Sequence, residues 1–199
     1  MRQETGSNPI STNKKVSIQV KLGGRSFSAD NFAAAESAEQ VEFVIDTPRV
    51  TLAPRGEVSI DNASELLRIV GKTCLDNEQS VCSELQADIV AIMAIDHKAL
   101  NSIVEKWGSR AAFSSPLLDM RHSDDYALTI DCTDNICYMR LFDEGLRRAE
   151  AYAITAPEDV LYHVTEWLDN EEWETPIYIK GKQNAIKLLR KYYKRVICE

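Results

Sequence analysis

Apolar and polar residues alternate along the stretch 126–154, and two short polar interruptions divide it into three segments. In the first segment Ile130 and Cys132 share one face, which is the two-residue period of a half-buried strand. Asp134 and Asn135 are typical of a two-residue turn, and an Asp-Glu-Gly sequence suits the second turn. The pattern predicts three consecutive strands joined by tight turns.

A helix, a strand and a second helix are predicted after these strands. Thr155-Ala156-Pro157-Glu158 has the composition of a capping box, and the residues that follow are apolar at helical spacing. Pro176–Ile179 is a short apolar strand, and one face of 183–195 is apolar again. The second half therefore predicts the order βββαβα, to which Val196–Cys198 can add an edge strand.

A similar order can be traced in the first half. Val16–Leu22 alternates strictly, and Gly23-Gly24 is a hairpin signal because both residues accept a positive φ. Arg25–Asp30 is then the predicted return strand. Further strand patterns lie on either side of Pro48, which has no N–H to donate and marks a bend or an edge.

Three further patterns complete the first half. A helix is predicted near 62–70, and Asp88–Ile95 has the apolar run of a strand covered on both faces. Asp96 and Gly108 mark the two ends of a second helix. Residues 72–87 give no clear pattern. Each half thus predicts a three-strand segment followed by helix, strand and helix, which implies an α/β protein with mixed sheets.

The order of elements also divides the chain. Residues 1–14 are polar and are predicted to be a disordered tail. The first half is predicted to span 15–120, and the second 121–199. A charged run around residue 120 forms the connection between them.

Composition narrows the class of partner. The net charge is −8 and the pI about 5.0, which disfavours a nucleic-acid surface because phosphate binding depends on clustered Lys and Arg. The polar N-terminus resembles no secretion signal, and the longest apolar stretch is far below the ~20 residues of a membrane helix. We expect a cytoplasmic protein that binds neither nucleic acid nor membrane.

Five cysteines show no zinc-finger spacing and no CxxC pair. Cys132 and Cys137 lie on neighbouring predicted strands around one turn. They form either a redox pair or two reduced thiols, and a reducing cytoplasm favours the second interpretation.

Four segments carry a resemblance to a known fold: VSIQVKLGGRSFSAD, DIVAIMAIDHKALNSIVEKWG, LTIDCTDNICYMRLFDEGLRRAEAYAI and PIYIKGKQNAIKLLRKY. Together they resemble the duplicated ribonuclease-H-like fold of the actin-like ATPases, and most closely an uncharacterised family of such proteins from Bacteroidetes-type bacteria. The resemblance implies two ribonuclease-H-like halves. Because the chain is short for this fold, it also implies reduced inserted subdomains and a shallow cleft.

Catalytic members of the superfamily hold nucleotide phosphates in two turns that combine an Asp, for Mg²⁺ and water, with glycines that let backbone N–H groups approach. The first turn here has Gly23 and Gly24 but no preceding Asp. The second has Asp131 and Thr133 but no glycine. On the adenosine side only Gly181 stands where two glycines are usual. Each phosphate loop keeps half of what the chemistry needs.

These departures favour a non-catalytic scaffold that binds an unidentified protein partner or pairs as a homodimer. We assign no catalytic residue, metal ligand or cofactor. In an alternative, ATP with Mg²⁺ binds a cleft lined by the five residues named above. A third hypothesis, a metal-dependent nuclease, needs converging carboxylates, for which only Asp131 and a distant Glu166 are candidates.

Structural explanations exist for the same residues. Asp131 can simply begin a turn, Gly23-Gly24 can form an ordinary hairpin, and Gly181 can meet a local backbone requirement. The basic run from Lys180 to Arg195 is either a solvated face or the counterpart of the acidic stretch 169–174. Trp173 in that stretch is the best candidate for an exposed contact.

Overall fold

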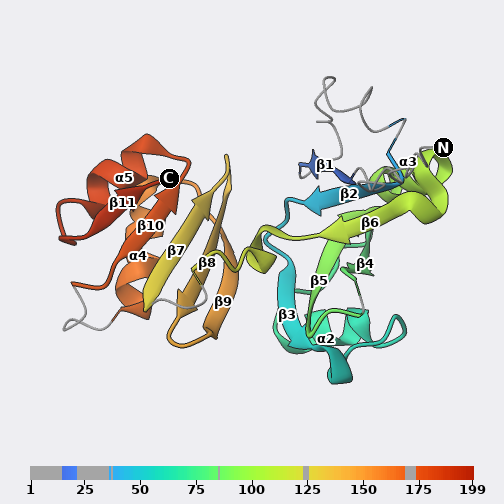
Figure 1. Ribbon diagram of the computed structural model, residues 1–199, viewed down its shortest axis with the longest axis horizontal. Coiled ribbons are helices and arrows are strands. Elements are labelled where there is room, and N and C mark those ends of the chain that lie inside the picture. The colour runs from blue at the N-terminus through green and yellow to red at the C-terminus, as the bar shows by residue number, and fades with distance from the viewer. Residues whose placement is uncertain (1–14, 22–35, 37, 85, 123–125, 169–173) are drawn as a thin grey trace, which may run out of the picture.

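A computed structural model describes residues 15–21, 36, 38–84, 86–122, 126–168 and 174–199, and they form two lobes (Figure 1). A short segment that contains the 3₁₀ turn η3 (Pro116–Leu118) runs between the lobes. The predicted tail at 1–14 and the hairpin residues Gly23, Gly24 and 25–30 lie outside the described residues. No helix in the described ranges is long and apolar enough to cross a membrane.

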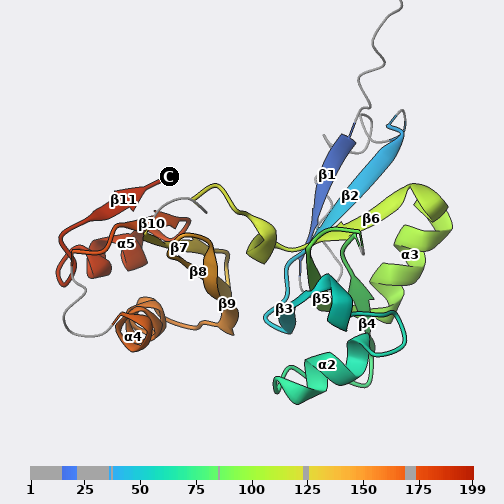
Figure 2. The same ribbon diagram turned by 60° about the horizontal axis from the view of Figure 1, so that its bottom comes forward.

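The second lobe has the element order that the alternation predicts. Its elements are β7 (Ala127–Cys132), β8 (Ile136–Phe142), β9 (Leu146–Ala153), α4 (Pro157–Trp167), β10 (Ile177–Lys180), α5 (Gln183–Leu189) and β11 (Val196–Cys198). The strands form one sheet in the order β11-β10-β7-β8-β9. The strands β7, β8 and β9 are antiparallel neighbours, whereas β10 and β11 run parallel to β7. Both helices cover one face of this sheet (Figure 2).

The first lobe contains two small sheets and two described α-helices. β1 (Lys15–Val20), β2 (Gln40–Ile45) and β6 (Ala111–Ser114) form a parallel sheet in the order β1-β2-β6. The second sheet is antiparallel, in the order β3-β5-β4, from β3 (Val50–Pro54), β4 (Glu78–Cys82) and β5 (Ile89–Asp96). The helices are α2 (Ala63–Ile69) and α3 (His97–Trp107), and the 3₁₀ turns η1 (Arg55–Glu57) and η2 (Gly108–Arg110) complete the lobe.

The described strands of this lobe therefore differ from the single mixed sheet expected for each half. Asp46 donates its backbone N–H to Val20 O at the end of β2, and Pro48 lacks the N–H that a continued strand would need. The chain turns there, so β3 enters the antiparallel sheet instead. β4 lies in the stretch 72–87, which has no clear pattern of apolar residues, and it pairs with β5 along its whole length.

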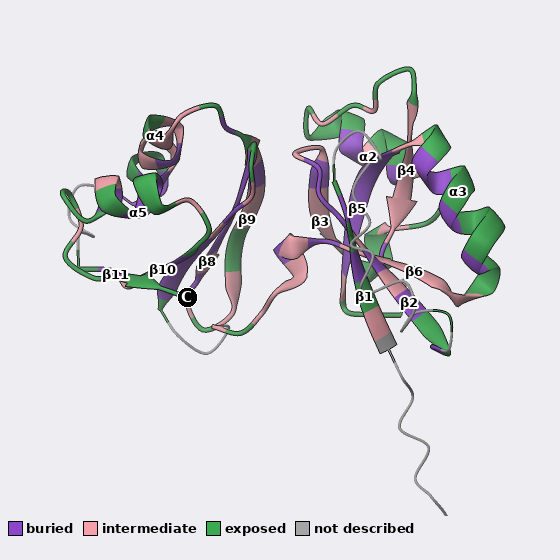
Figure 3. Ribbon diagram, turned by 90° about the horizontal axis from the view of Figure 1, so that it is seen from above, coloured by how far each residue is buried: buried purple, intermediate pink, exposed green. Residues whose placement is uncertain are grey.

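The two lobes share one hydrophobic core. Ile136, Tyr138 and Ala151 of the second lobe belong to the same cluster of buried side chains as Phe43 and Trp107 of the first. Figure 3 shows β5 and β8 as mostly buried strands, and β8 is covered on one face by its own helices and on the other by the first lobe. The lobes are thus packed against each other over the meander of the second sheet.

Candidate functional site

Three of the five predicted site residues line one cleft between the lobes. The cleft has a volume of about 400 Å³, and its lining includes Asp131, Thr133 and Gly181 from the second lobe and Lys21 from the first. The other two predicted residues, Gly23 and Gly24, lie outside the described part of the chain.

The sheet explains why Asp131 and Gly181 meet. β7 and β10 are parallel neighbours in which Asp131 and Lys180 are directly paired. Parallel strands that follow each other across a sheet end at the same edge, where α/β proteins place their binding sites. Gly181 comes directly after β10, so it faces the end of β7.

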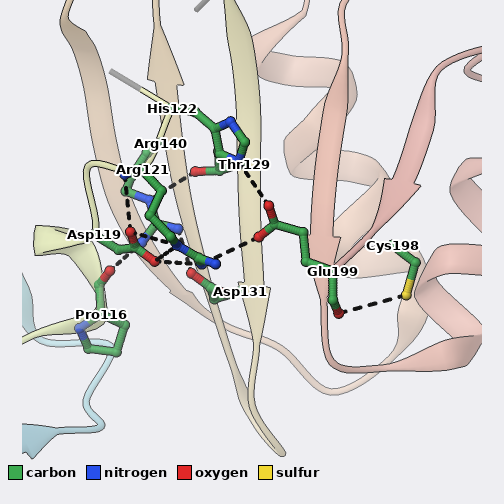
Figure 4. Close-up of polar contacts among 9 residues, drawn as sticks. All are labelled: Pro116, Asp119, Arg121, His122, Thr129, Asp131, Arg140, Cys198 and Glu199. Atoms are coloured by element: carbon green, nitrogen blue, oxygen red, sulfur yellow. Dashed lines mark hydrogen bonds and ion pairs between the residues drawn. The ribbon is translucent and has the colours of Figure 1, made fainter. Parts of the chain in front are cut away.

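The Asp131 carboxylate already has a cationic partner inside the protein. The guanidinium of Arg140, on the adjacent strand β8, donates from Nη2 to Asp131 Oδ2 at 2.5 Å (Figure 4). Its Nε donates to Thr129 Oγ1 at 2.9 Å, and its Nη1 donates to the carbonyl oxygen of Pro116. The Arg140 residue is only 1% exposed. Three fixed acceptors therefore hold a buried positive charge beside the carboxylate that only the nucleotide-binding alternative would place near Mg²⁺.

A second carboxylate of the cleft, Asp119, is paired in the same way. Arg121 donates to it through Nε at 2.7 and 2.9 Å. Burial alone would raise the pKa of Asp119, but the hydrogen bonds from Arg121 and the charges of Arg140 and Arg121 hold this pKa below its usual value. Arg121 also contacts Glu199 at 3.3 Å, and Glu199 is hydrogen-bonded to His122 at 2.8 Å.

The third carboxylate, Asp134, contacts the other lobe. Lys21 Nζ lies 2.9 Å from Asp134 Oδ2, and this hydrogen bond and charge lower the pKa of Asp134 and raise that of Lys21. Each of the three Asp side chains in the described lining thus has a basic partner. Of the charged residues of that lining, Lys180 is the one for which the described residues supply no ion-pair partner.

One more carboxylate, Asp46, joins the lobes behind the cleft. Tyr138 donates its hydroxyl to Asp46 Oδ1 at 2.7 Å, and Thr133 Oγ1 lies 3.3 Å from the same oxygen. Burial raises the pKa of Asp46 above its usual value, although both hydrogen bonds lower it. Burial is also the main cause of the raised pKa of Tyr138. Asp46 directly follows β2, much as Asp131 lies next to the last residue of β7, and this position at a strand end is the sequence signal that could have identified Asp46.

Gly181 is explained by the backbone around it. Its φ is +107°, and a Cβ at this position would lie 2.0 Å from the carbonyl oxygen of Cys132. No side chain fits there without moving β7 or the β10–α5 connection. This local backbone requirement is enough to explain why residue 181 is a glycine.

Cys132 and Cys137 face each other across the hairpin. They are directly paired residues of β7 and β8, and both are free thiols. A hydrogen bond with Cys137 lowers the pKa of Cys132, and the charge of Lys182 acts in the same direction. The same hydrogen bond, together with burial, raises the pKa of Cys137.

The remaining sequence candidates lie elsewhere. Glu166 is on α4, where it neighbours His163 at 3.5 Å and Arg148 at 3.9 Å. Among the described residues no group of three or more His, Cys, Asp or Glu side chains converges as metal ligands would. Trp173 lies outside the described ranges.

Comparison with known proteins identifies the class of fold. No protein-family model matches the chain, and no curated protein matches it. A solved structure from Bacteroides thetaiotaomicron, described as a protein with an actin-like ATPase fold and unknown function, is similar with a TM-score of 0.72 at 17% identity. The match covers 98% of this chain and 94% of that one. The protein therefore has the actin-like ATPase fold, and the prediction of this fold is confirmed.

Two more distant similarities were found. The cytoplasmic domain of EpsL, an inner-membrane component of the type II secretion system of Vibrio cholerae, matches with a TM-score of 0.42 at 10% identity, over 83% of this chain and 81% of that one. The AlfA filament bound to AMPPNP matches with the same TM-score and identity, over 85% of this chain and 56% of that one.

Proposed function

We propose that this protein is a non-catalytic interaction scaffold, in which the actin-like fold is kept and the cleft no longer holds a metal-bound nucleotide. The observation that carries the proposal is the ion pair between Asp131 and the buried Arg140. Mg²⁺ is bound in such sites through one or two carboxylates plus substrate phosphates. To bind Asp131, the ion would have to share the carboxylate with a buried cation that repels it, or displace Arg140 and leave a buried guanidinium without its counterion, and both are unfavourable.

The contacts between the lobes support the same proposal. Lys21 and Asp134 pair across the mouth of the cleft, and Asp46 receives a hydrogen bond from Tyr138 behind it. The shared core fixes the lobes as well. Two lobes joined by these contacts suit the binding of a partner better than a cycle of closure around a nucleotide. We further propose that it acts in the cytoplasm, in keeping with five free thiols.

The partner is proposed to be another protein or a second copy of this chain. Affinity capture from an extract of the source cells, with and without ATP and Mg²⁺, tests this proposal. We expect the same partner in both eluates. A partner that is released only when ATP is present would overturn the non-catalytic scaffold. Sedimentation equilibrium of the purified chain separates the homodimer from the heterologous complex.

ATP binding is a second candidate function, favoured by the cleft volume and by Lys180 in its lining, for which the described residues supply no ion-pair partner. A thermal melt with millimolar ATP and Mg²⁺ distinguishes it from the scaffold. A ligand present at 100 times its dissociation constant adds about 2.7 kcal/mol to the free energy of unfolding. We expect no change in melting temperature, and a clear increase would favour the nucleotide-binding alternative.

A further inference from the structure

The last part of this acidic protein carries a concentration of positive charge. Between Glu174 and Glu199 the sequence has no acidic residue. Seven basic residues lie in that interval, and we call them the basic face: Lys180, Lys182, Lys187, Arg190, Lys191, Lys194 and Arg195. Since the whole chain carries a net charge of −8, the rest of the molecule is more acidic still. The basic face is therefore a local reversal of sign.

Part of this positive charge is exposed to solvent along the helix α5. The helix α5 buries Ala185, Ile186 and Leu189 against the sheet, which leaves Lys187 outside. The backbone N–H of Lys191 bonds to Leu188 O, so the helical path continues past the end of α5. Residues four apart on a helix share a face, so Lys187 and the exposed Lys191 are neighbours.

Among the described residues, only part of the basic face is paired with acidic side chains. Lys194 pairs with Glu174 at 3.1 Å, and Arg190 approaches the carbonyl oxygen of Val196 at 3.5 Å. Among the described residues no ion pair with an acidic side chain is seen for Lys180, Lys187 or Lys191, whereas the charge of Lys182 lowers the pKa of Asp134. In the described residues, this part of α5 thus lacks the pairing seen in the cleft, where each Asp has a basic partner.

The face is also continuous with the cleft. Lys180 lines the cleft and precedes α5, while Lys191 and the 59% exposed Tyr192 lie past its other end. From Lys182 to Lys191 the row is about 14 Å long at 1.5 Å per helical residue. An extended chain covers that length with about four residues.

We propose that the basic face binds an acidic segment of a partner polypeptide, which lies along α5 with one carboxylate side chain entering the cleft at Lys180. This inference rests on the proposed scaffold function and names the partner's chemistry. The basic residues from Lys182 to Lys191 follow the single helix α5, and a surface of this width fits one extended polypeptide chain. Three of the four apolar residues of α5, Ala185, Ile186 and Leu189, are buried in the core, so α5 has no broad apolar face to enter a bilayer. The acidic remainder of the molecule repels the broad anionic surfaces of membranes and nucleic acids.

Fluorescence anisotropy with a fluorescein-labelled peptide of repeated Glu-Glu-Ser-Gly units tests the proposal. We expect the wild-type chain to bind this peptide and not the matching Gln-Gln-Ser-Gly peptide. The variant K187E/K191E should bind the Glu-Glu-Ser-Gly peptide at least about tenfold more weakly. Reversing one charge at an interface changes the dissociation constant by a factor on the order of ten. The same variant should gain affinity for a Lys-Lys-Ser-Gly peptide, which a misfolded protein would not do.

K98E/R147E is the matched control, because it changes the net charge equally at exposed sites off the basic face. It should bind the Glu peptide within about twofold of wild type. Equal losses in both double variants, or equal binding of the Gln peptide, would overturn the proposal. Equal affinity for a DNA oligonucleotide or for phosphatidylglycerol vesicles would also overturn it. A failure here leaves the ATP melting result unaffected, so the basic face and the scaffold function are judged separately.

Discussion

Replacing Arg140 with Met is the sharpest stability test of the account. Met keeps much of the aliphatic volume but removes the guanidinium that contacts Asp131, Thr129 and the carbonyl oxygen of Pro116. The Asp131 carboxylate, whose side chain is 18% exposed, then has an apolar neighbour in place of its cationic partner. Removing one partner of a buried ion pair costs about 3–5 kcal/mol. R140M should therefore lower the free energy of unfolding by about 4 kcal/mol, as measured by urea denaturation.

A double-mutant cycle separates the ion pair from general loss of packing. D131N alone should cost about 3 kcal/mol, because the buried Arg140 loses its counterion, although its other two acceptors remain. The double variant R140M/D131N should be more stable than the sum of the single effects predicts, by at least about 1.5 kcal/mol. If the two effects add to within about 0.5 kcal/mol, Asp131 and Arg140 are not coupled and the reasoning about the cleft is refuted.

Three further predictions follow from the same region. G181A should lower the free energy of unfolding, measured in urea, by more than about 2 kcal/mol, because the added Cβ meets a backbone oxygen at a positive φ. The control G56A has open space at its Cβ and should change the free energy of unfolding by less than about 0.5 kcal/mol. Burial raises the pKa of Asp46 in the folded protein above its value in the unfolded chain. The contribution of Asp46 to the free energy of unfolding is therefore full below the pKa of the unfolded state and is lost as pH rises through the pKa of the folded state. The stability of wild type relative to D46N, from urea denaturation across acidic to neutral pH, should therefore fall as pH increases, and a rise would contradict the assignment. Thr133 donates its backbone N–H to the Ile136 carbonyl one step nearer the turn, so Cys132 and Cys137 form a non-hydrogen-bonded pair of the antiparallel ladder. The two residues of such a pair lie close enough for a disulfide, and oxidation with diamide should therefore join the two thiols. Peptide mapping that finds both thiols free after diamide would refute this geometry.

The second lobe could be predicted from local pattern because its information is local. The alternation over 126–154 and the capping sequence before α4 fix elements that contact their neighbours in sequence. The cap itself forms one residue later than expected, since Asp159 rather than Glu158 accepts from Thr155 and Ala156. The parallel ends of β7 and β10 then bring Asp131 and Gly181 together, as the resemblance implied.

What could not be predicted depends on contacts between distant segments. An arginine in the middle of an apolar strand, such as Arg140, is normally predicted to face solvent. The packing of the first lobe on β8 buries Arg140 instead. β4 has a single strongly apolar residue, Val81, and its strand conformation comes from pairing with β5. The role of Asp46 likewise appears only when Tyr138 arrives from the other lobe. In each case the deciding partner is far away in sequence.

The central claim is that Asp131 is neutralised by Arg140 and does not hold a metal-bound nucleotide. Electron paramagnetic resonance of Mn²⁺, titrated with ATP into wild type and D131N, tests this claim directly, because Mn²⁺ replaces Mg²⁺ at carboxylate and phosphate ligands. The account predicts the same signal of unbound Mn²⁺ for both proteins at every ATP concentration. Stoichiometric loss of that signal with wild type, and not with D131N, would contradict it.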